Sequence, residues 1–310
     1  MSLYLLRLGI GFMLLISGMN LTSKSLKYLV DKGLKQYAEI FSGYLFLEIS
    51  IGIVSTIIVQ SSSIVTVIIV ALVNSGVINF RQSAGIIIGS NIGTTITTHI
   101  VTFNRAGFML YFFLAGIFLY LINNQHCKNL SRVFIGFSFL FFSLNFLESN
   151  VFLKYNEKII PIVKILCSNP LLSITAGIIL TAILQSSSLT SIFLVLTARQ
   201  SHIDLITAVF ILIGVNIGTC TTSLIASLWA VREAKKAALF HLFFNVIGAI
   251  FIMSIFPIYI NIIKYISPDE IGKQIANAHT MFNVLSAIIV LPFLDTILNL
   301  INKLLSEQRS

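Results

Sequence analysis

The stretch Gln60-Ser61-Ser62-Ser63 lies between long apolar segments, and it recurs unchanged as Gln185-Ser186-Ser187-Ser188. A second motif, Asn91-Ile92-Gly93-Thr94, recurs as Asn216-Ile217-Gly218-Thr219. Both pairs have the same separation, because 185 − 60 and 216 − 91 both give 125. One spacing shared by two polar motifs indicates a chain with two homologous halves.

Single residues extend the repeat beyond these motifs. Gly52 matches Gly177 and Thr56 matches Thr181 at the same spacing, and further matches reach back to the first helix of the chain. We therefore predict one domain over residues 1–310, with repeat 1 at 3–122, repeat 2 at 128–260 and an additional C-terminal transmembrane helix at 275–305.

The composition is that of a protein embedded in a bilayer. Hydrophobic residues make up 56% of the chain and charged residues 10%, and the mean hydropathy is +0.96. A soluble protein carries about 25% charged residues. We therefore expect an all-α integral membrane protein that crosses the cell (plasma or inner) membrane several times. The formal charge of +9 could indicate a nucleic-acid partner, but Lys and Arg lie mostly in short connections, so membrane topology explains them better.

Metal and carboxylate chemistry has little support in the sequence. Cys127, Cys167 and Cys220 form no CxxC pair and no His/Cys cluster, which argues against a transition-metal site or a disulfide framework. Between Glu48 and Glu148 the chain contains no Asp or Glu. Polar chemistry in the first half must therefore come from neutral oxygens and amides.

Seven segments are apolar over about the 20 residues that a helical crossing requires. The apolar arms beside each Gln-Ser-Ser-Ser motif are shorter, so each motif is predicted to form the tip of a re-entrant helical hairpin. Each half then has an odd number of crossings, which makes the repeats inverted. Lysine-rich segments at 22–41 and 148–167 are predicted to be interfacial amphipathic helices. The predicted crossings are 3–20, 83–103, 106–122, 130–147, 206–229, 236–260 and 277–302.

The tips need polar partners, because an unpaired polar group in an apolar medium costs free energy. Serine hydroxyls donate and accept, and glutamine adds amide donors and a carbonyl acceptor. If a helix starts just after each glutamine, its free N–H groups and positive dipole end face the tip. Two such ends that meet from opposite sides would form an anion site. Tight packing of small residues explains a single copy equally well, but two copies in register favour the site.

The Asn-Ile-Gly-Thr motifs are predicted to supply a cation site. Glycine in mid-helix permits unwinding, so we expect a discontinuous helix in each half, with free carbonyls that suit a hard cation. Neutral oxygens beside an anion would favour sodium. Threonines beyond Thr94 and Thr219 can equally well bond their own helix backbone. The candidate sodium ligands are Gln60, Asn91, Thr94, Thr95, Gln185, Asn216, Thr219 and Thr221.

A His-x-x-Phe-Asn pattern occurs twice near the C-terminus. His241 and Asn245 are four residues apart, as are His279 and Asn283, so each pair lies on one helical face. We prefer a role in packing or interhelix hydrogen bonding over proton sensing.

The paired Q-S-S-S and N-x-G-T motifs resemble those of the type II sodium/phosphate cotransporter family, and the resemblance covers nearly the whole chain. Further family-like stretches are Asn169-Pro170, Ala237-Ala238-Leu239-Phe240-His241 and Ile275-Ala276-Asn277-Ala278-His279-Thr280. The resemblance implies symport of inorganic phosphate with Na⁺ as the co-transported ion. It also implies that the two tips bind phosphate, through Gln60, Ser61, Ser62, Ser63, Gln185, Ser186, Ser187 and Ser188.

Several alternatives stay open at this point. The chain could export phosphate or carry another oxyanion, or it could be a membrane sensor or regulatory partner that binds phosphate without moving it. An enzyme is not expected, because no carboxylate pair, Ser/His/Asp arrangement or metal cluster lies near the motifs. Many bacterial relatives carry a PhoU-like domain after the membrane unit, and this sequence ends at Ser310 without one. The resemblance thus suggests a separate PhoU-like regulator as a partner, whereas the oligomeric state is not decided.

Overall fold

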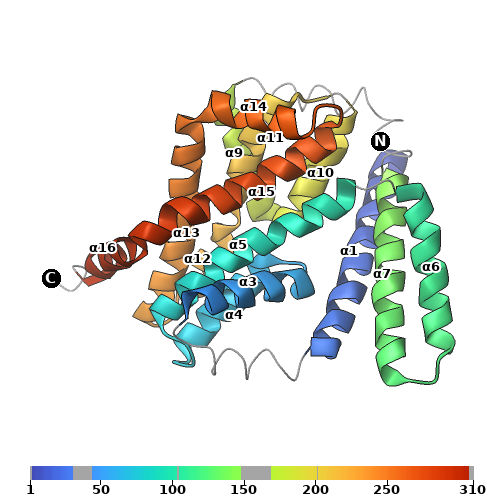
Figure 1. Ribbon diagram of the computed structural model, residues 1–310, viewed down its shortest axis with the longest axis horizontal. Helices are drawn as coiled ribbons and strands as arrows, with labels where there is room; N and C mark the ends of the chain where they lie inside the picture. The colour runs from blue at the N-terminus through green and yellow to red at the C-terminus, as the bar shows by residue number, and fades with distance from the viewer. Residues whose placement is uncertain (1, 31–43, 103–104, 148–168, 201, 307–310) are drawn as a thin grey trace.

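The computed structural model describes residues 2–30, 44–102, 105–147, 169–200 and 202–306, and this part of the chain is helical, with no strand (Figure 1). The all-α prediction is confirmed. In chain order the helices are α1 (Ser2–Val30), α3 (Leu45–Val59), α4 (Ser62–Asn74), α5 (Phe80–Thr102), α6 (Arg105–Leu121), α7 (Gln125–Leu147), α9 (Pro170–Leu184), α10 (Ser187–Arg199), α11 (Leu205–Gly218), α12 (Cys220–Ser227), α13 (Arg232–Ser254), α14 (Phe256–Ile266), α15 (Ile271–Val290), η2 (Leu291–Phe293) and α16 (Leu294–Ser306).

The helices around the two Gln-Ser-Ser-Ser motifs have matching bounds. Adding 125 to the bounds of α3 gives those of α9, and the same shift takes α4 onto α10. It also takes α5 onto the span from the start of α11 to the end of α12. The two halves therefore share one order of helices around the motifs. Their inverted arrangement across a membrane and the re-entrant position of the hairpins stay predictions.

Glycines bring equivalent helices together in the two halves. A Cβ atom on Gly89 of α5 would collide with the carbonyl oxygen of Ile49 in α3. A Cβ atom on Gly214 of α11 would collide in the same way with the carbonyl oxygen of Ile174 in α9. Because only glycine permits this approach, the first hairpin arm of each half packs directly on the helix that carries the Asn-Ile-Gly-Thr motif.

The first Asn-Ile-Gly-Thr motif does not interrupt its helix, so the prediction of a discontinuous helix is wrong for this copy. α5 continues through Gly93, where a Cβ atom would lie 2.7 Å from the carbonyl oxygen of Ile53. This glycine therefore serves close packing rather than unwinding. In the second copy the helix is divided at Thr219, which nevertheless keeps helical angles of φ −60° and ψ −26°.

Helices α1, α6 and α7 form a three-helix group at one side of the molecule, with α7 packed against both others (Figure 1). Gly18 and Gly136 permit a close approach between α1 and α7, since a Cβ atom on Gly18 would lie 2.8 Å from the carbonyl oxygen of Gly136. The chain is therefore divided into this group and a larger body that contains all four motifs.

α1 is longer than the sequence suggests. It continues past residue 20 to Val30, so the expected boundary between a crossing at 3–20 and a separate helix from residue 22 is wrong. Thr22 is buried, and its hydroxyl donates to the carbonyl oxygen of Gly18 at 2.9 Å within the same helix. The rest of the predicted segment 22–41, and all of 148–167, lie outside the described residues.

Two predicted crossings are interrupted at a proline. The helix expected over 236–260 ends at Ser254, and α14 begins at Phe256 with Pro257 in its first turn. The helix expected over 277–302 contains the 3₁₀ turn η2 around Pro292, between α15 and α16. Proline has no N–H to donate and favours the first turn of a new helix, which explains both interruptions.

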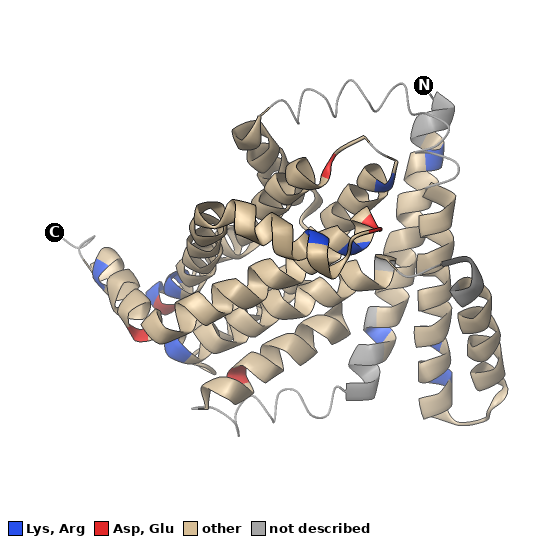
Figure 2. Ribbon diagram, turned by 45° about the horizontal axis from the view of Figure 1, so that its top comes forward, with Lys and Arg blue, Asp and Glu red and all other residues tan. Residues whose placement is uncertain are grey.

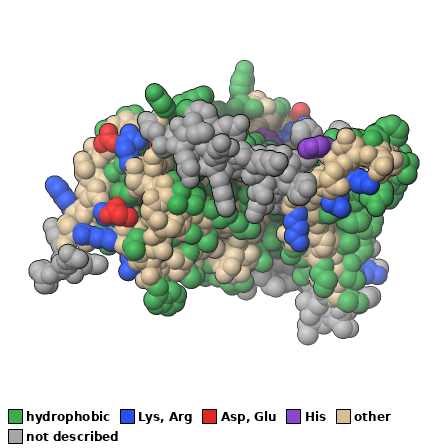
Figure 3. Space-filling view, turned by 90° about the horizontal axis from the view of Figure 1, so that it is seen from below, with side chains coloured by type: hydrophobic (Ala, Val, Ile, Leu, Met, Phe, Trp, Pro, Cys, Tyr) green, Lys and Arg blue, Asp and Glu red, His purple; other side chains and the backbone are tan. Residues whose placement is uncertain are grey.

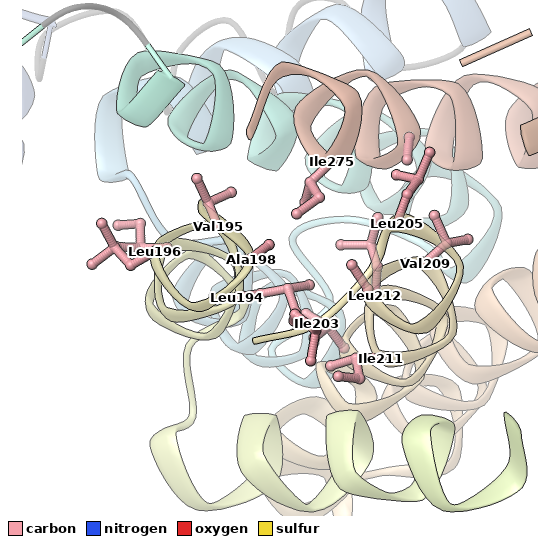
Figure 4. Packing of buried hydrophobic residues seen from close by; sticks show 14 of the residues in the cluster. Leu194, Val195, Leu196, Ala198, Ile203, Leu205, Val209, Ile211, Leu212 and Ile275 are labelled. Atoms are coloured by element: carbon pink, nitrogen blue, oxygen red, sulfur yellow. The ribbon is translucent and has the colours of Figure 1, made fainter. Parts of the chain in front are cut away.

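Buried apolar side chains form two clusters. One is centred on α10 and α11, where Leu194 and Leu212 pack together with Ile275 of α15 (Figure 4). The other includes Ile87 of α5 and Phe244 of α13. Helices α13 and α15 contribute residues to both clusters, so they join the two halves of the larger body.

The outer surface is that of a membrane protein. Within the described part of the chain, four helical spans are long and apolar enough to cross a bilayer: Gln125–Leu147, Leu205–Ser227, Arg232–Ser254 and Ile271–Ser306. Charged residues lie mostly near helix ends (Figure 2), and hydrophobic side chains cover much of the surface in Figure 3. Large side chains such as Phe46, Ile183 and Trp229 are exposed. Lipid can solvate these residues, whereas water would penalise their exposure.

Candidate functional site

Each Gln-Ser-Ser-Ser motif forms a tight turn between two helices. Gln60 and Gln185 end the first helix with left-handed backbones, at φ 54° and φ 50°. Ser61 and Ser186 are then extended, and each side chain accepts a hydrogen bond at 3.3 Å from the backbone N–H three residues on. This is N-capping, so the second and third serines of each motif form the first turn of α4 or α10.

The two turns meet. The hydroxyl oxygens of Ser62 and Ser187 lie 3.5 Å apart, although 125 residues separate them in the chain, and both residues are 2% exposed. Because each serine is the first residue of its helix, the amino-terminal ends of α4 and α10 converge at this point. Free N–H groups and two positive dipole ends therefore face a shared region, which is an arrangement that suits an anion.

The first turn has unused hydrogen-bonding capacity. Gln60 and Ser63 are buried at 4% exposure each, and neither Gln60 Oε1 nor Ser63 Oγ has a hydrogen-bond partner. Ser188, the equivalent of Ser63, is also buried, but Gln185 is exposed. The two tips are thus unequal: only the first places its glutamine in the interior. Buried polar atoms without partners are costly and mark a place where a polar ligand would be stabilised.

The asparagines of the Asn-Ile-Gly-Thr motifs are buried and fixed in orientation. The amide nitrogen of Asn91 donates to the carbonyl oxygen of Ile87 at 2.8 Å, and that of Asn216 donates to Leu212 at 2.9 Å. These bonds assign the nitrogen and the oxygen of each side chain. Each Oδ1 then points away from its own helix and accepts from a different helix: Asn91 from Asn245 of α13, and Asn216 from Asn283 of α15, at 3.4 and 3.3 Å.

The threonines mostly bond their own helices. Thr94, Thr95 and Thr219 each donate to a backbone carbonyl three or four residues earlier. Thr221, in the first turn of α12, is half-buried. A hydroxyl that donates in this way keeps free lone pairs on its oxygen, so it can still coordinate a cation. Its hydrogen-bonding needs are already met without a ligand.

Two further hydroxyl pairs, which the sequence did not predict as part of the site, lie close to the tips. Thr56 donates to Ser90 Oγ at 2.8 Å, which links α3 to α5, and Thr181 donates to Thr190 Oγ1 at 3.3 Å, which links the two arms of the second hairpin. The match between Thr56 and Thr181 was visible in the repeat, but its partners were not, because Ser90 has no polar equivalent at residue 215.

The two His-x-x-Phe-Asn patterns form interhelix hydrogen bonds, as predicted. Nδ1 of His241 lies 3.0 Å from Ser223 Oγ, and Nδ1 of His279 lies 3.0 Å from Thr98 Oγ1. Ser223 and Thr98 are equivalent residues, because 223 − 98 is 125. The C-terminal patterns therefore contact the repeated part of the chain at matching places.

The sequence was compared with those of known proteins and families. The family described as Na⁺/Pi-cotransporter matches residues 14–149 and 152–267. An uncharacterized protein of Bacillus subtilis, YqeW, is 27% identical over 267 residues, which is 83% of this chain and 84% of that protein. No solved structure matches the chain.

Two relatives with functional names match over shorter stretches. The rabbit sodium-dependent phosphate transport protein 2A is 49% identical over 57 residues, 18% of this chain and 9% of its own length. The putative inorganic phosphate export protein YjbB of Escherichia coli is 25% identical over 205 residues, 65% of this chain and 38% of its own length. The chain thus spans well under half of either of these two proteins.

Proposed function

The chain belongs to the Na⁺/Pi-cotransporter family, and we propose that it carries inorganic phosphate across the cell membrane together with sodium. The observation that supports this most is the contact between Ser62 and Ser187, which brings the amino-terminal ends of α4 and α10 together. The rabbit and E. coli relatives described above are both named for the transport or export of phosphate. Both names support phosphate transport, whereas sodium coupling, direction and the transport cycle are further steps of the proposal.

Phosphate binds, in this proposal, between the two tips. Ser62 and Ser187 contribute the facing hydroxyls, Ser63 and Ser188 the next ones, and the first-turn N–H groups of both helices add neutral donors. Ser61 and Ser186 hold the turns as N-caps. The amide oxygen of Gln60 is an acceptor without a partner, so it suits the sodium ion rather than the anion. The site holds an oxyanion largely through dipoles and hydroxyls, so it suits a ligand that must also be released.

Sodium binds at the oxygens beside the tips. The acceptor oxygens of Asn91 and Asn216, the hydroxyl oxygens of nearby threonines and the buried amide oxygen of Gln60 are neutral hard ligands. Gln185 is exposed and contributes less. Positive charge is needed, because phosphate is an anion and each elementary charge moved across the membrane involves about 2.3 kcal/mol per 100 mV. Two sodium ions would neutralise a dianion, and three would make transport electrogenic.

The arrangement of two halves supports a transport cycle of alternating access. The halves carry equivalent hairpins that meet at Ser62 and Ser187, and we propose that they are inverted repeats that rock or gate around this midplane contact. Export is the second candidate, because the E. coli relative bears the name of a phosphate export protein. Import and export use the same site and differ in the gradient that drives the cycle.

Uptake by purified protein in sealed liposomes tests the proposal. With an inward sodium gradient we expect accumulation of radiolabelled phosphate that potassium does not support and that excess unlabelled phosphate, but not sulfate, abolishes. Loss of preloaded phosphate under an outward sodium gradient would report the same carrier in reverse. Phosphate binding with no flux under either gradient would overturn the transport proposal in favour of a sensor.

A further inference from the structure

Two helices near the C-terminus carry the same side chains at the same relative places. His241 and Asn245 lie on α13, and His279 and Asn283 lie on α15, with a separation of 38 in both cases because 279 − 241 and 283 − 245 agree. All four residues are completely buried. This correspondence lies outside the 125-residue repeat, which would pair His241 with Gly116.

The contacts of the two helices cross between the halves. On α13, His241 bonds Ser223 of the second half, while Asn245 bonds Asn91 of the first half. On α15 the assignment is reversed. His279 bonds Thr98 of the first half, while Asn283 bonds Asn216 of the second half. Each helix is thus anchored to one half by its histidine and reaches the other half with its asparagine.

The first residues of α13 and α15 also make matching contacts, each with the end of one hairpin. Asn74 at the end of α4 accepts from the backbone N–H of Val231, the N-cap of α13, at 2.7 Å. Arg199, the equivalent of Asn74 because 199 − 74 is 125, donates to Glu270, the N-cap of α15. The start of α13 therefore contacts the end of the first hairpin, and the start of α15 contacts the end of the second. This match between α13 and α15 does not depend on their histidines.

One serine links the α13 histidine to the backbone of α12. Ser223 Oγ lies 2.9 Å from the carbonyl oxygen of Cys220 and 3.0 Å from Nδ1 of His241. Nε2 of His241 is left without a partner, as is Oδ1 of Asn245. The amide nitrogen of Asn245 donates one proton to the carbonyl oxygen of His241 at 3.0 Å. Its second proton is shared between Asn91 Oδ1 at 3.4 Å and the sulfur of Cys220 at 3.3 Å.

We propose that Asn245 and Asn283 are positioning residues of the transport site. Each orients the acceptor oxygen of one Asn-Ile-Gly-Thr asparagine, and each does so from a helix that a histidine ties to the opposite half. This inference rests on the proposed function, because it takes Asn91 and Asn216 as sodium ligands. Its consequence is that a change at the sodium ligands of one half is transmitted to the other half through α13 and α15.

Serine replacements test the inference with little risk to folding. In Asn245→Ser and Asn283→Ser the hydroxyl can still donate to the carbonyl four residues earlier, as Ser286 does to Phe282 on α15 at 2.7 Å. Serine is too short to reach Asn91 or Asn216. The control is Asn277→Ser on α15, because Asn277 bonds Ser267 Oγ and touches neither motif through its amide.

We expect the half-saturating sodium concentration for phosphate uptake to rise about five- to tenfold in either variant, the size of one lost net hydrogen bond. The half-saturating phosphate concentration at saturating sodium should change by less than about twofold, and the control should match the wild type. Lower maximal uptake with an unshifted sodium dependence, or equal shifts for sodium and phosphate, would indicate a packing role and overturn the inference.

A second readout separates this inference from the proposed function. If the wild type shows no sodium-driven uptake, the sodium-dependent rise in its thermal unfolding temperature in detergent, measured against potassium, serves in place of flux. The serine variants should then need about five- to tenfold more sodium for the same rise. Variants whose unfolding temperature depends on sodium as in the wild type would overturn the positioning role. A wild type in which sodium changes neither phosphate uptake nor the unfolding temperature would overturn both proposals.

Discussion

Gln60 and Gln185 have the same identity and nearly the same backbone, but they have different surroundings. Both adopt the left-handed conformation that turns the chain between the hairpin arms. Gln60 is buried and its amide oxygen has no partner, whereas Gln185 is exposed. The side chains therefore have unequal value for ligand binding, although the sequence repeat treats them as equivalent.

Replacing each glutamine by glycine isolates this difference, because glycine adopts a positive φ without strain and removes only the side chain. We expect Gln60→Gly to raise the half-saturating phosphate or sodium concentration at least about tenfold, and Gln185→Gly to change it less than about threefold. Measuring both in the same uptake assay makes each variant the control for the other. Equal losses would show that the exposed glutamine also reaches the ligand.

At the scale of helices, the ends of the second hairpin and of α5 are held together by one guanidinium group. Arg199 donates to Glu270 Oε1 at 2.8 and 2.6 Å and to the carbonyl oxygen of Thr102 at 3.0 Å. Its side chain is 17% exposed. This fork joins the last turn of α10, the last residue of α5 and the N-cap of α15.

Lysine cannot reproduce the fork, because its single ammonium group lacks the planar pair of donors. We expect Arg199→Lys to lower the free energy of unfolding by about 1 kcal/mol, seen as a lower thermal unfolding temperature in detergent. Arg81→Lys is the matched control, since the Arg81–Asp295 pair is 3.5 Å long with side chains that are 50% and 77% exposed. An effect at Arg81 as large as that at Arg199 would contradict this account.

The sequence predicted the helices better than their interruptions. The short hairpin arms and the repeat of their bounds follow from apolar runs on either side of a polar tip. The break expected at Gly93 does not occur, because a glycine that permits unwinding also permits close packing, and only the neighbouring Ile53 decides between the two. The break near Pro257 was missed, although proline in an apolar run is a signal that sequence alone provides.

At the scale of the whole molecule, the candidate site depends on contacts between distant parts of one chain. The duplication predicted that Ser62 and Ser187 belong to equivalent tips, and their 3.5 Å contact places the two tips together. The roles of α13 and α15 could not be predicted in this way. These two helices match each other at a different spacing and in only a few residues. Which half each of those side chains contacts can be seen only in the structure.

Removal of the two facing hydroxyls tests whether the meeting point of the tips binds phosphate for transport. The variant is Ser62→Ala with Ser187→Ala, and the measurement is phosphate uptake into proteoliposomes under an inward sodium gradient. The matched control is Ser50→Ala with Thr175→Ala, another equivalent pair 125 residues apart, whose hydroxyls each donate to a carbonyl of their own helix at 2.8 Å.

We expect the tip variant to fold like the wild type and to lose at least about tenfold in uptake at subsaturating phosphate, which corresponds to one or two lost hydrogen bonds to a charged ligand. The control variant should transport like the wild type. Unchanged phosphate uptake in the variant that lacks both Ser62 and Ser187 would contradict the claim.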